Sequence, residues 1–114
     1  MNADQVALLR LNLTPGLGRA TLLKLLQVYP CPRAVLEHTP AQWTRTAGIN
    51  ASRVEQVPAE DDALVLRATE YIRQHQVRIL SINSAEYPHP LRQISDPPAL
   101  LYICLLYTSD AADE

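Results

Sequence analysis

The chain has 114 residues, of which 47% are hydrophobic, and a formal net charge of −2, a composition that is ordinary for a globular protein with one modest core. No apolar run approaches the roughly 18 residues of a transmembrane helix, and the N-terminal segment lacks the basic and apolar regions of a signal peptide. Two cysteines, Cys31 and Cys104, are too few for a disulfide framework or a metal site. We therefore expect a protein of the reducing cytoplasm with no membrane association.

The charge is distributed unevenly along the sequence. Residues 1–58 carry six basic and three acidic side chains, a net charge of +3, whereas residues 59–103 carry four basic and six acidic ones, a net charge of −2. Residues 104–114 carry three acidic side chains and no basic one. The mildly basic first half permits contact with nucleic acid, but its excess is smaller than that of a strong nonspecific DNA binder.

The first half of the chain predicts a bundle of about five short helices, each dependent on tertiary packing. Prolines at positions 30 and 32 break one helix and start the next, and Thr39, Pro40 and Gln42 form the capping box of another. The expected helices are residues 4–12, 19–28, 32–37, 40–47 and 51–57.

Two glycine-containing turns between these helices are candidate DNA contacts. The first precedes a strongly apolar helix, which is the sequence form of a helix-hairpin-helix, and such a hairpin leaves backbone N–H groups free to bind a phosphate. In the second, Asn50 is expected to adopt a left-handed conformation or to cap the next helix. The alternative is that both hairpins only pack helices together. The candidate DNA-binding residues are Gly16, Leu17, Gly18, Arg19 and Lys24 in the first hairpin and Gly48, Asn50 and Arg53 in the second.

Other chemically capable side chains are better explained by structure. Trp43 shares a helix face with Ala47, which favours the core over base stacking, and the acidic pair at 61 and 62 suits a helix N-terminus better than a metal site. The three histidines have no ligand or triad spacing, and nucleophile-elbow, Walker and dinucleotide-binding motifs are absent. The sequence therefore predicts no catalytic residue, no metal and no cofactor.

The second half predicts a longer helix over residues 59–76 and two strands of buried type, 77–82 and 99–103, with a turn and a short helix around Leu91 between them. Acidic residues crowd the expected first turn of the longer helix. Its expected apolar face comprises Leu64, Ala68, Tyr71, Ile72 and His75.

The order helix, strand, helix, strand is typical of the beginning of a doubly wound parallel sheet. Such a sheet needs several more strands and covered faces. We therefore expect the chain to stop inside a second domain.

Two stretches of the sequence match a known pattern. One is Leu-Thr-Pro-Gly-Leu-Gly at residues 13–18, and the more specific one is Glu86-Tyr87-Pro88, followed by Leu91, Ile94, Asp96-Pro97-Pro98 and Leu100-Leu101-Tyr102. Over residues 5–103 the sequence thus resembles the DprA/Smf family of bacterial DNA-processing proteins.

The resemblance implies a mainly α fragment: a SAM-like helical domain over residues 1–58, then a linking helix and the first strands of a truncated Rossmann-like domain over residues 59–103. It implies binding of single-stranded DNA and the loading of RecA onto that DNA in natural transformation, without enzymatic activity. The family's main basic DNA-binding pocket lies later in the Rossmann-like domain than this chain reaches. We therefore expect the fragment itself to bind DNA weakly or not at all.

Residues 104–114 depart from the family pattern, and we interpret them as a non-native tail translated from a sequencing adapter, a genuine acidic C-terminus being the alternative.

An alternative function also stays open. The helical domain is then a protein-interaction or dimerisation module that uses an apolar patch, which makes a homo-oligomer possible.

Overall fold

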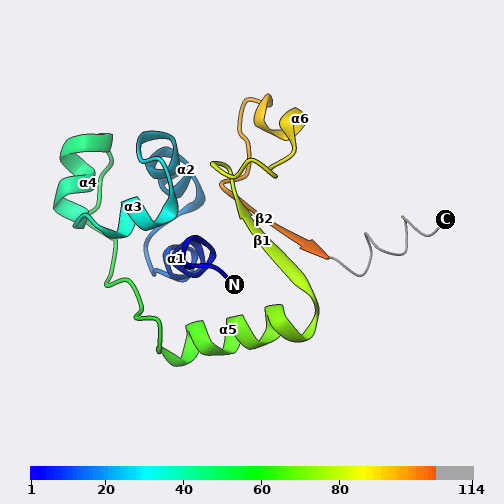
Figure 1. The fold of residues 1–114 in the computed structure, drawn as a ribbon. Coiled ribbons are helices and arrows are strands. Elements are labelled where there is room, and N and C mark those ends of the chain that lie inside the picture. The colour runs from blue at the N-terminus through cyan, green and yellow to red at the C-terminus, as the bar shows by residue number, and fades with distance from the viewer. Residues whose placement is uncertain (105–114) are drawn as a thin grey trace.

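Helix α1 (Ala3–Asn12) lies at the centre of the computed structural model, and the other elements surround it (Figure 1). Asn2 caps this helix, since its side chain accepts from the Gln5 backbone N–H at 2.8 Å and the Gln5 side chain returns to the Asn2 N–H. Leu8, Leu9 and Leu11 point in different directions around the helix, and all are buried. Each such burial stabilises the fold by roughly 2 kcal/mol. The structure describes residues 1–104.

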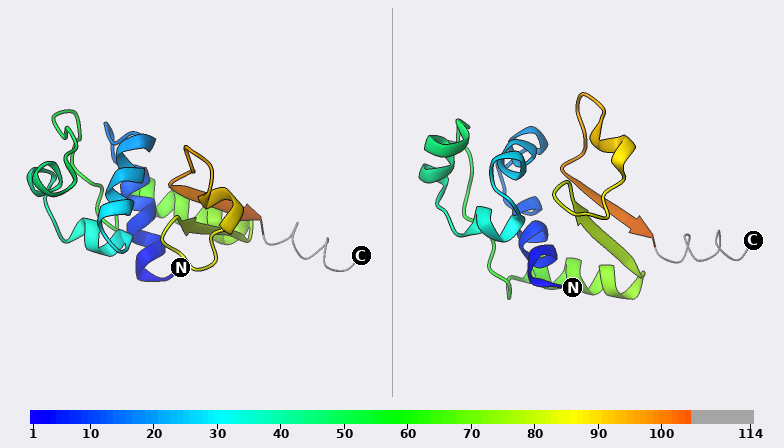
Figure 2. Two further views of the ribbon diagram at one scale, coloured as in Figure 1. Left: turned by 90° about the horizontal axis from the view of Figure 1, so that it is seen from above. Right: turned by 45° about the horizontal axis from the view of Figure 1, so that its top comes forward.

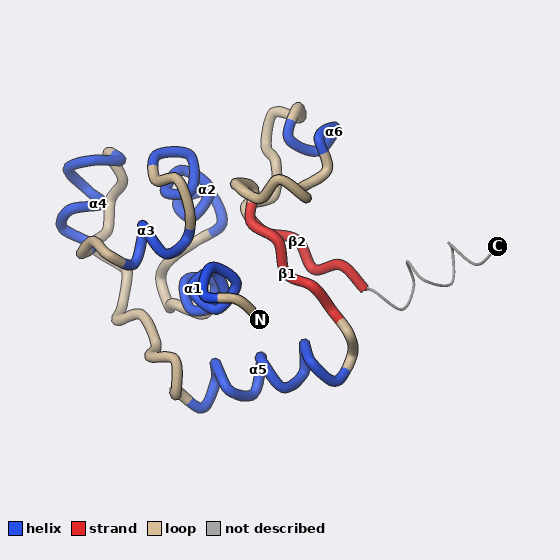
Figure 3. Tube along the Cα trace, in the orientation of Figure 1, coloured by secondary structure: helices blue, strands red, loops and turns tan. Residues whose placement is uncertain are grey.

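Three further helices lie close to their predicted positions: α2 (Arg19–Val28), α3 (Pro32–Leu36) and α4 (Pro40–Ala47) (Figure 3). The predicted capping box of α4 is present, with the Thr39 hydroxyl accepting from the Gln42 N–H at 3.2 Å and the Gln42 side chain accepting from the Thr39 N–H at 2.8 Å. Gly48 ends α4 with a φ of +69°, as its position predicts.

The predicted helix over residues 51–57 is wrong, because this segment is an irregular connection. The Glu55 N–H donates to the Pro15 carbonyl at 2.9 Å, so its backbone pairs with the first hairpin instead of with its own preceding turn. Asn50 neither adopts a left-handed conformation nor caps a helix, since its side chain accepts from the Ser52 N–H at 3.0 Å in a local turn. Seven residues are too few to hold a helix against such competing bonds.

Helix α5 (Ala63–Gln74) begins four residues later than predicted. Asp62 caps it by accepting from the Leu64 N–H at 2.9 Å, so Glu60 and Asp61 precede the helix and do not form its first turn. The predicted apolar face is also wrong in part. Val65 and Ile72 are buried, and an outward face carries exposed Leu64, Tyr71 and His75.

The two strands, β1 (Val77–Ser81) and β2 (Leu100–Cys104), pair antiparallel, with Ile79 opposite Tyr102. The parallel arrangement expected for them is therefore wrong. The connection between them, which contains helix α6 (His89–Arg92), folds back on itself and is closed by the Ile82 N–H donating to the Ala99 carbonyl at 3.0 Å. The chain thus re-enters beside the end of the strand that it left, as an antiparallel pair requires. Strand β2 is half exposed and not of buried type, with 52% of Tyr102 accessible.

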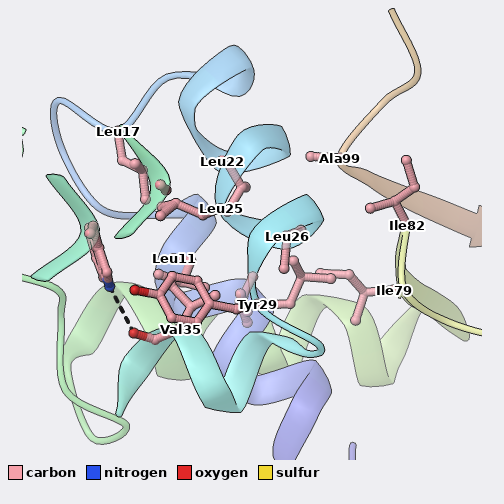
Figure 4. Packing of buried hydrophobic residues seen from close by; sticks show 14 of the residues in the cluster. Leu11, Leu17, Leu22, Leu25, Leu26, Tyr29, Val35, Ile79, Ile82 and Ala99 are labelled. Atoms are coloured by element: carbon pink, nitrogen blue, oxygen red, sulfur yellow. Dashed lines mark hydrogen bonds between the residues drawn. The ribbon is translucent and has the colours of Figure 1, made fainter. Parts of the chain in front are cut away.

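One hydrophobic cluster joins α1 to α5, β1 and both ends of the β1–β2 connection (Figure 4). Polar contacts also connect residues 1–58 with the residues that follow them. The Asn83 amide donates to the Leu26, Tyr29 and Pro30 carbonyls, at 2.7, 3.1 and 3.0 Å, and the Gln5 amide donates to the Ile79 carbonyl. The described chain is a mainly helical structure with a small antiparallel sheet.

The interpretation of residues 104–114 as a non-native tail falls, except for Cys104, outside the described residues.

Candidate nucleic-acid interface

The two predicted hairpins lie side by side on one side of the molecule, although about thirty residues separate them in the sequence (Figure 2). The first hairpin, residues 14–19, packs against residues 53–55 through the backbone bond between Pro15 and Glu55. The Lys24 ammonium nitrogen lies 3.9 Å from where a Cβ on Gly48 would be, so this side chain reaches from α2 to the second hairpin. The structure therefore brings the two predicted hairpins next to each other, and we call the surface that they share the hairpin face.

Gly16 is required by the geometry of this face. Its φ is +83°, a conformation that side chains disfavour. A Cβ on Gly16 would also overlap the Arg53 carbonyl. Gly16 therefore serves both a left-handed turn and a close backbone approach.

Gly18 has a different role, because its backbone is extended (φ −77°) and a Cβ on it would meet nothing within 4 Å. It is the N-cap of α2 and offers no side-chain bond to the first N–H groups of that helix. The first N–H groups of α2 thus have no side-chain cap from Gly18, and donors at a helix N-terminus can bind an anion. Leu17 does not share this exposure, since its N–H donates to the Thr14 carbonyl at 3.2 Å and its side chain is buried.

Three exposed cations lie in or next to the hairpins: Arg19, Lys24 and Arg53. They are offset by two carboxylates. Glu55 follows Arg53 by two residues, and Asp96, from the β1–β2 connection, lies 3.9 Å from the Arg19 guanidinium. Both partners of that ion pair are highly exposed, so the pair contributes little to stability. Its position next to α2 has no signal in the sequence, because 77 positions separate the two residues.

Residues 86–98 shape the connection between the strands. The Tyr87 hydroxyl donates to the Pro98 carbonyl at 2.7 Å, and the Arg92 guanidinium lies 5.3 Å from the Tyr87 ring centre. Burial raises the pKa of the Tyr87 phenol, which keeps it a neutral donor. These contacts tie the two ends of the connection to each other.

The remaining candidates occupy structural positions. Trp43 is 1% exposed and its indole N–H donates to the Val35 carbonyl at 2.9 Å, so the prediction of a core residue is confirmed. His38 and His75 each direct Nδ1 to the carbonyl four residues earlier. Among residues 1–104, no group of three or more histidine, cysteine, aspartate or glutamate side chains is placed to hold a metal ion.

Comparison of the chain with models of protein families, with curated proteins and with solved structures finds no match. Within the described part of the chain, no helix combines the length and the apolar character needed to cross a membrane.

Proposed function

We propose that this chain is the N-terminal part of a DprA/Smf-like DNA-processing protein and that its hairpin face contacts the phosphodiester backbone of DNA. The observation that carries the proposal is the side-by-side position of the two hairpins, with three exposed cations, Arg19, Lys24 and Arg53, in or next to them. The first N–H groups of α2, which Gly18 leaves without a side-chain cap, add donors for a phosphate.

Such a surface binds weakly. Three cations can neutralise at most three phosphates, which limits the slope of log K against log salt concentration to roughly −2 on a single strand. Glu55 and Asp96 reduce the attraction further. In the whole protein the main affinity then comes from the Rossmann-like part that follows, and the hairpin face is an additional contact.

The proposal extends to the whole protein through the family resemblance. That protein binds single-stranded DNA in the cytoplasm, hands it to RecA and is not an enzyme. The Glu86–Tyr102 stretch, which carries the resemblance, forms the connection and second strand next to the hairpin face.

The test is a titration of a labelled single-stranded oligonucleotide at several salt concentrations. The double variant Arg19→Glu and Lys24→Glu should abolish binding, and Lys24→Glu alone should weaken it. Arg33→Glu, on α3, changes the net charge by the same amount as Lys24→Glu and should leave the affinity nearly unchanged. Affinity that ignores salt, or equal losses in Lys24→Glu and Arg33→Glu, would contradict a phosphate contact at this face.

A second candidate, a protein-interaction or dimerisation module, is favoured by an apolar groove of about 340 Å³ beside the first hairpin. The groove is lined mainly by Leu13, Pro15, Val57, Pro58 and Leu64. Self-association through this groove would survive the double charge variant and would be lost in Leu64→Glu, as measured by sedimentation.

A further inference from the structure

The aromatic side chains of the described residues are distributed unevenly with respect to the hairpin face. Trp43, Tyr29 and Tyr87 are all buried, with 6% or less of each accessible. The exposed rings are Tyr71 on α5 and Tyr102 on β2, and the Tyr102 hydroxyl accepts from the Asn12 amide at 3.2 Å. Proteins that hold single strands stack the unpaired bases on aromatic rings. The hairpin face can therefore hold a phosphate backbone but offers no ring from these residues for a base.

Tyr71 is built into a flat, exposed surface. Its ring and that of His75, one turn later at the C-cap of α5, are stacked with centroids 4.0 Å apart and planes inclined by 20°. The His75 Nδ1 donates to the Tyr71 carbonyl at 3.0 Å, which fixes the orientation of the imidazole. Since 59% of Tyr71 is accessible, the stacked pair is open to solvent.

The charge next to this pair suits a nucleic-acid strand. Arg67 lies one turn before Tyr71, on the same side of the helix, and is exposed. The nearest carboxylate on α5, Glu70, is bound to the Arg73 guanidinium and the Gln74 amide, so its charge is compensated within the helix. Arg67, Tyr71 and His75 thus form a stripe with a cation at one end and two stacked rings at the other.

We propose that this stripe is a base-stacking site for single-stranded nucleic acid, in which an unpaired base stacks on the Tyr71–His75 pair and Arg67 contacts the adjacent phosphate. The inference rests on the proposed function and adds a division of labour to it. The hairpin face binds the backbone of single and double strands alike, and the stripe supplies the preference for unpaired bases.

The experiment compares the binding of the full chain to a thymidine oligonucleotide and to an abasic strand of the same length and charge. The wild-type protein should bind the thymidine strand more tightly, and Tyr71→Leu should weaken that binding by roughly 5- to 100-fold while leaving the abasic strand unaffected. Tyr71→Phe, which retains the ring, should behave as the wild type. Leu66→Ala removes an equally exposed apolar side chain from the same helix and serves as the matched control.

The outcomes separate the two proposals. If the wild type binds both strands equally, or Tyr71→Leu binds thymidine as the wild type does, the stacking site is overturned and the hairpin face stands. If the wild type binds neither strand, both proposals fall. If Tyr71→Leu abolishes a dimer seen by sedimentation but leaves the preference for the thymidine strand intact, the Tyr71–His75 pair contacts a second copy of the chain. The stacking site is then also overturned.

Discussion

At the scale of single residues, the two glycines of the first hairpin make opposite demands. Gly16 has a φ of +83° and its Cα faces the Arg53 carbonyl, whereas Gly18 is extended and borders open space. We expect Gly16→Ala to lower the free energy of unfolding by about 2 kcal/mol or more, because it adds left-handed strain to a backbone clash. Gly18→Ala should change it by less than about 1 kcal/mol. Urea unfolding of both variants measures the difference.

The pair also tests the hairpin geometry itself. Equal and small losses in the two variants would mean that the first hairpin does not pack against residues 53–55. The sequence alone identifies both glycines as turn residues, but it cannot tell them apart. What distinguishes them is the position of Arg53, a contact across 37 positions of the chain.

At the scale of elements, the Asn83 side chain joins the β1–β2 connection to the C-terminal end of α2. Its amide nitrogen lies within 3.1 Å of the Leu26 carbonyl oxygen in the last turn of the helix and of the Tyr29 and Pro30 carbonyl oxygens just after it. We expect Asn83→Ala to lower the free energy of unfolding by roughly 1–3 kcal/mol. Asn12→Ala removes the corresponding amide, which donates only to the exposed Tyr102 hydroxyl at 3.2 Å, and should cost less than about 1 kcal/mol. Matching losses in thermal or urea unfolding would show that Asn83 does not hold α2.

Local signals explain which elements were predictable. Capping chemistry and proline positions are contained within four or five residues, so the helices from Arg19 to Ala47 begin close to where the sequence predicts. Long-range contacts instead determine that the Tyr71 side chain is exposed and that β1 pairs antiparallel with β2. Helical periodicity fits several choices of apolar face on α5, and packing on α1 and β1 selects Val65 and Ile72. The connection after Ile82 has the length of a crossover, yet its own hydrogen bonds close it into a return.

At the scale of the whole molecule, the β1–β2 connection places a carboxylate against the hairpin face. Asp96 lies 3.9 Å from Arg19, the first residue of α2, so it competes with a phosphate for the same cation. If the hairpin face binds DNA as proposed, Asp96→Asn should tighten binding to a single strand several-fold at low salt, and the gain should shrink as salt screens the pair. Fluorescence anisotropy across a salt series measures both effects.

Glu37→Gln provides the matched control for this prediction, because it removes one negative charge at the end of α3. Glu37 lines a groove with Arg33 and Glu60 on the α1–α3 side of the molecule. If the effect of Asp96→Asn is local, Glu37→Gln should bind the single strand with nearly the wild-type affinity. Equal gains in affinity in the two variants would mean that the effect comes from net charge. They would contradict the prediction that Asp96 and a phosphate compete for Arg19. A gain confined to Asp96→Asn would trace the effect to the ion pair between the β1–β2 connection and the start of α2.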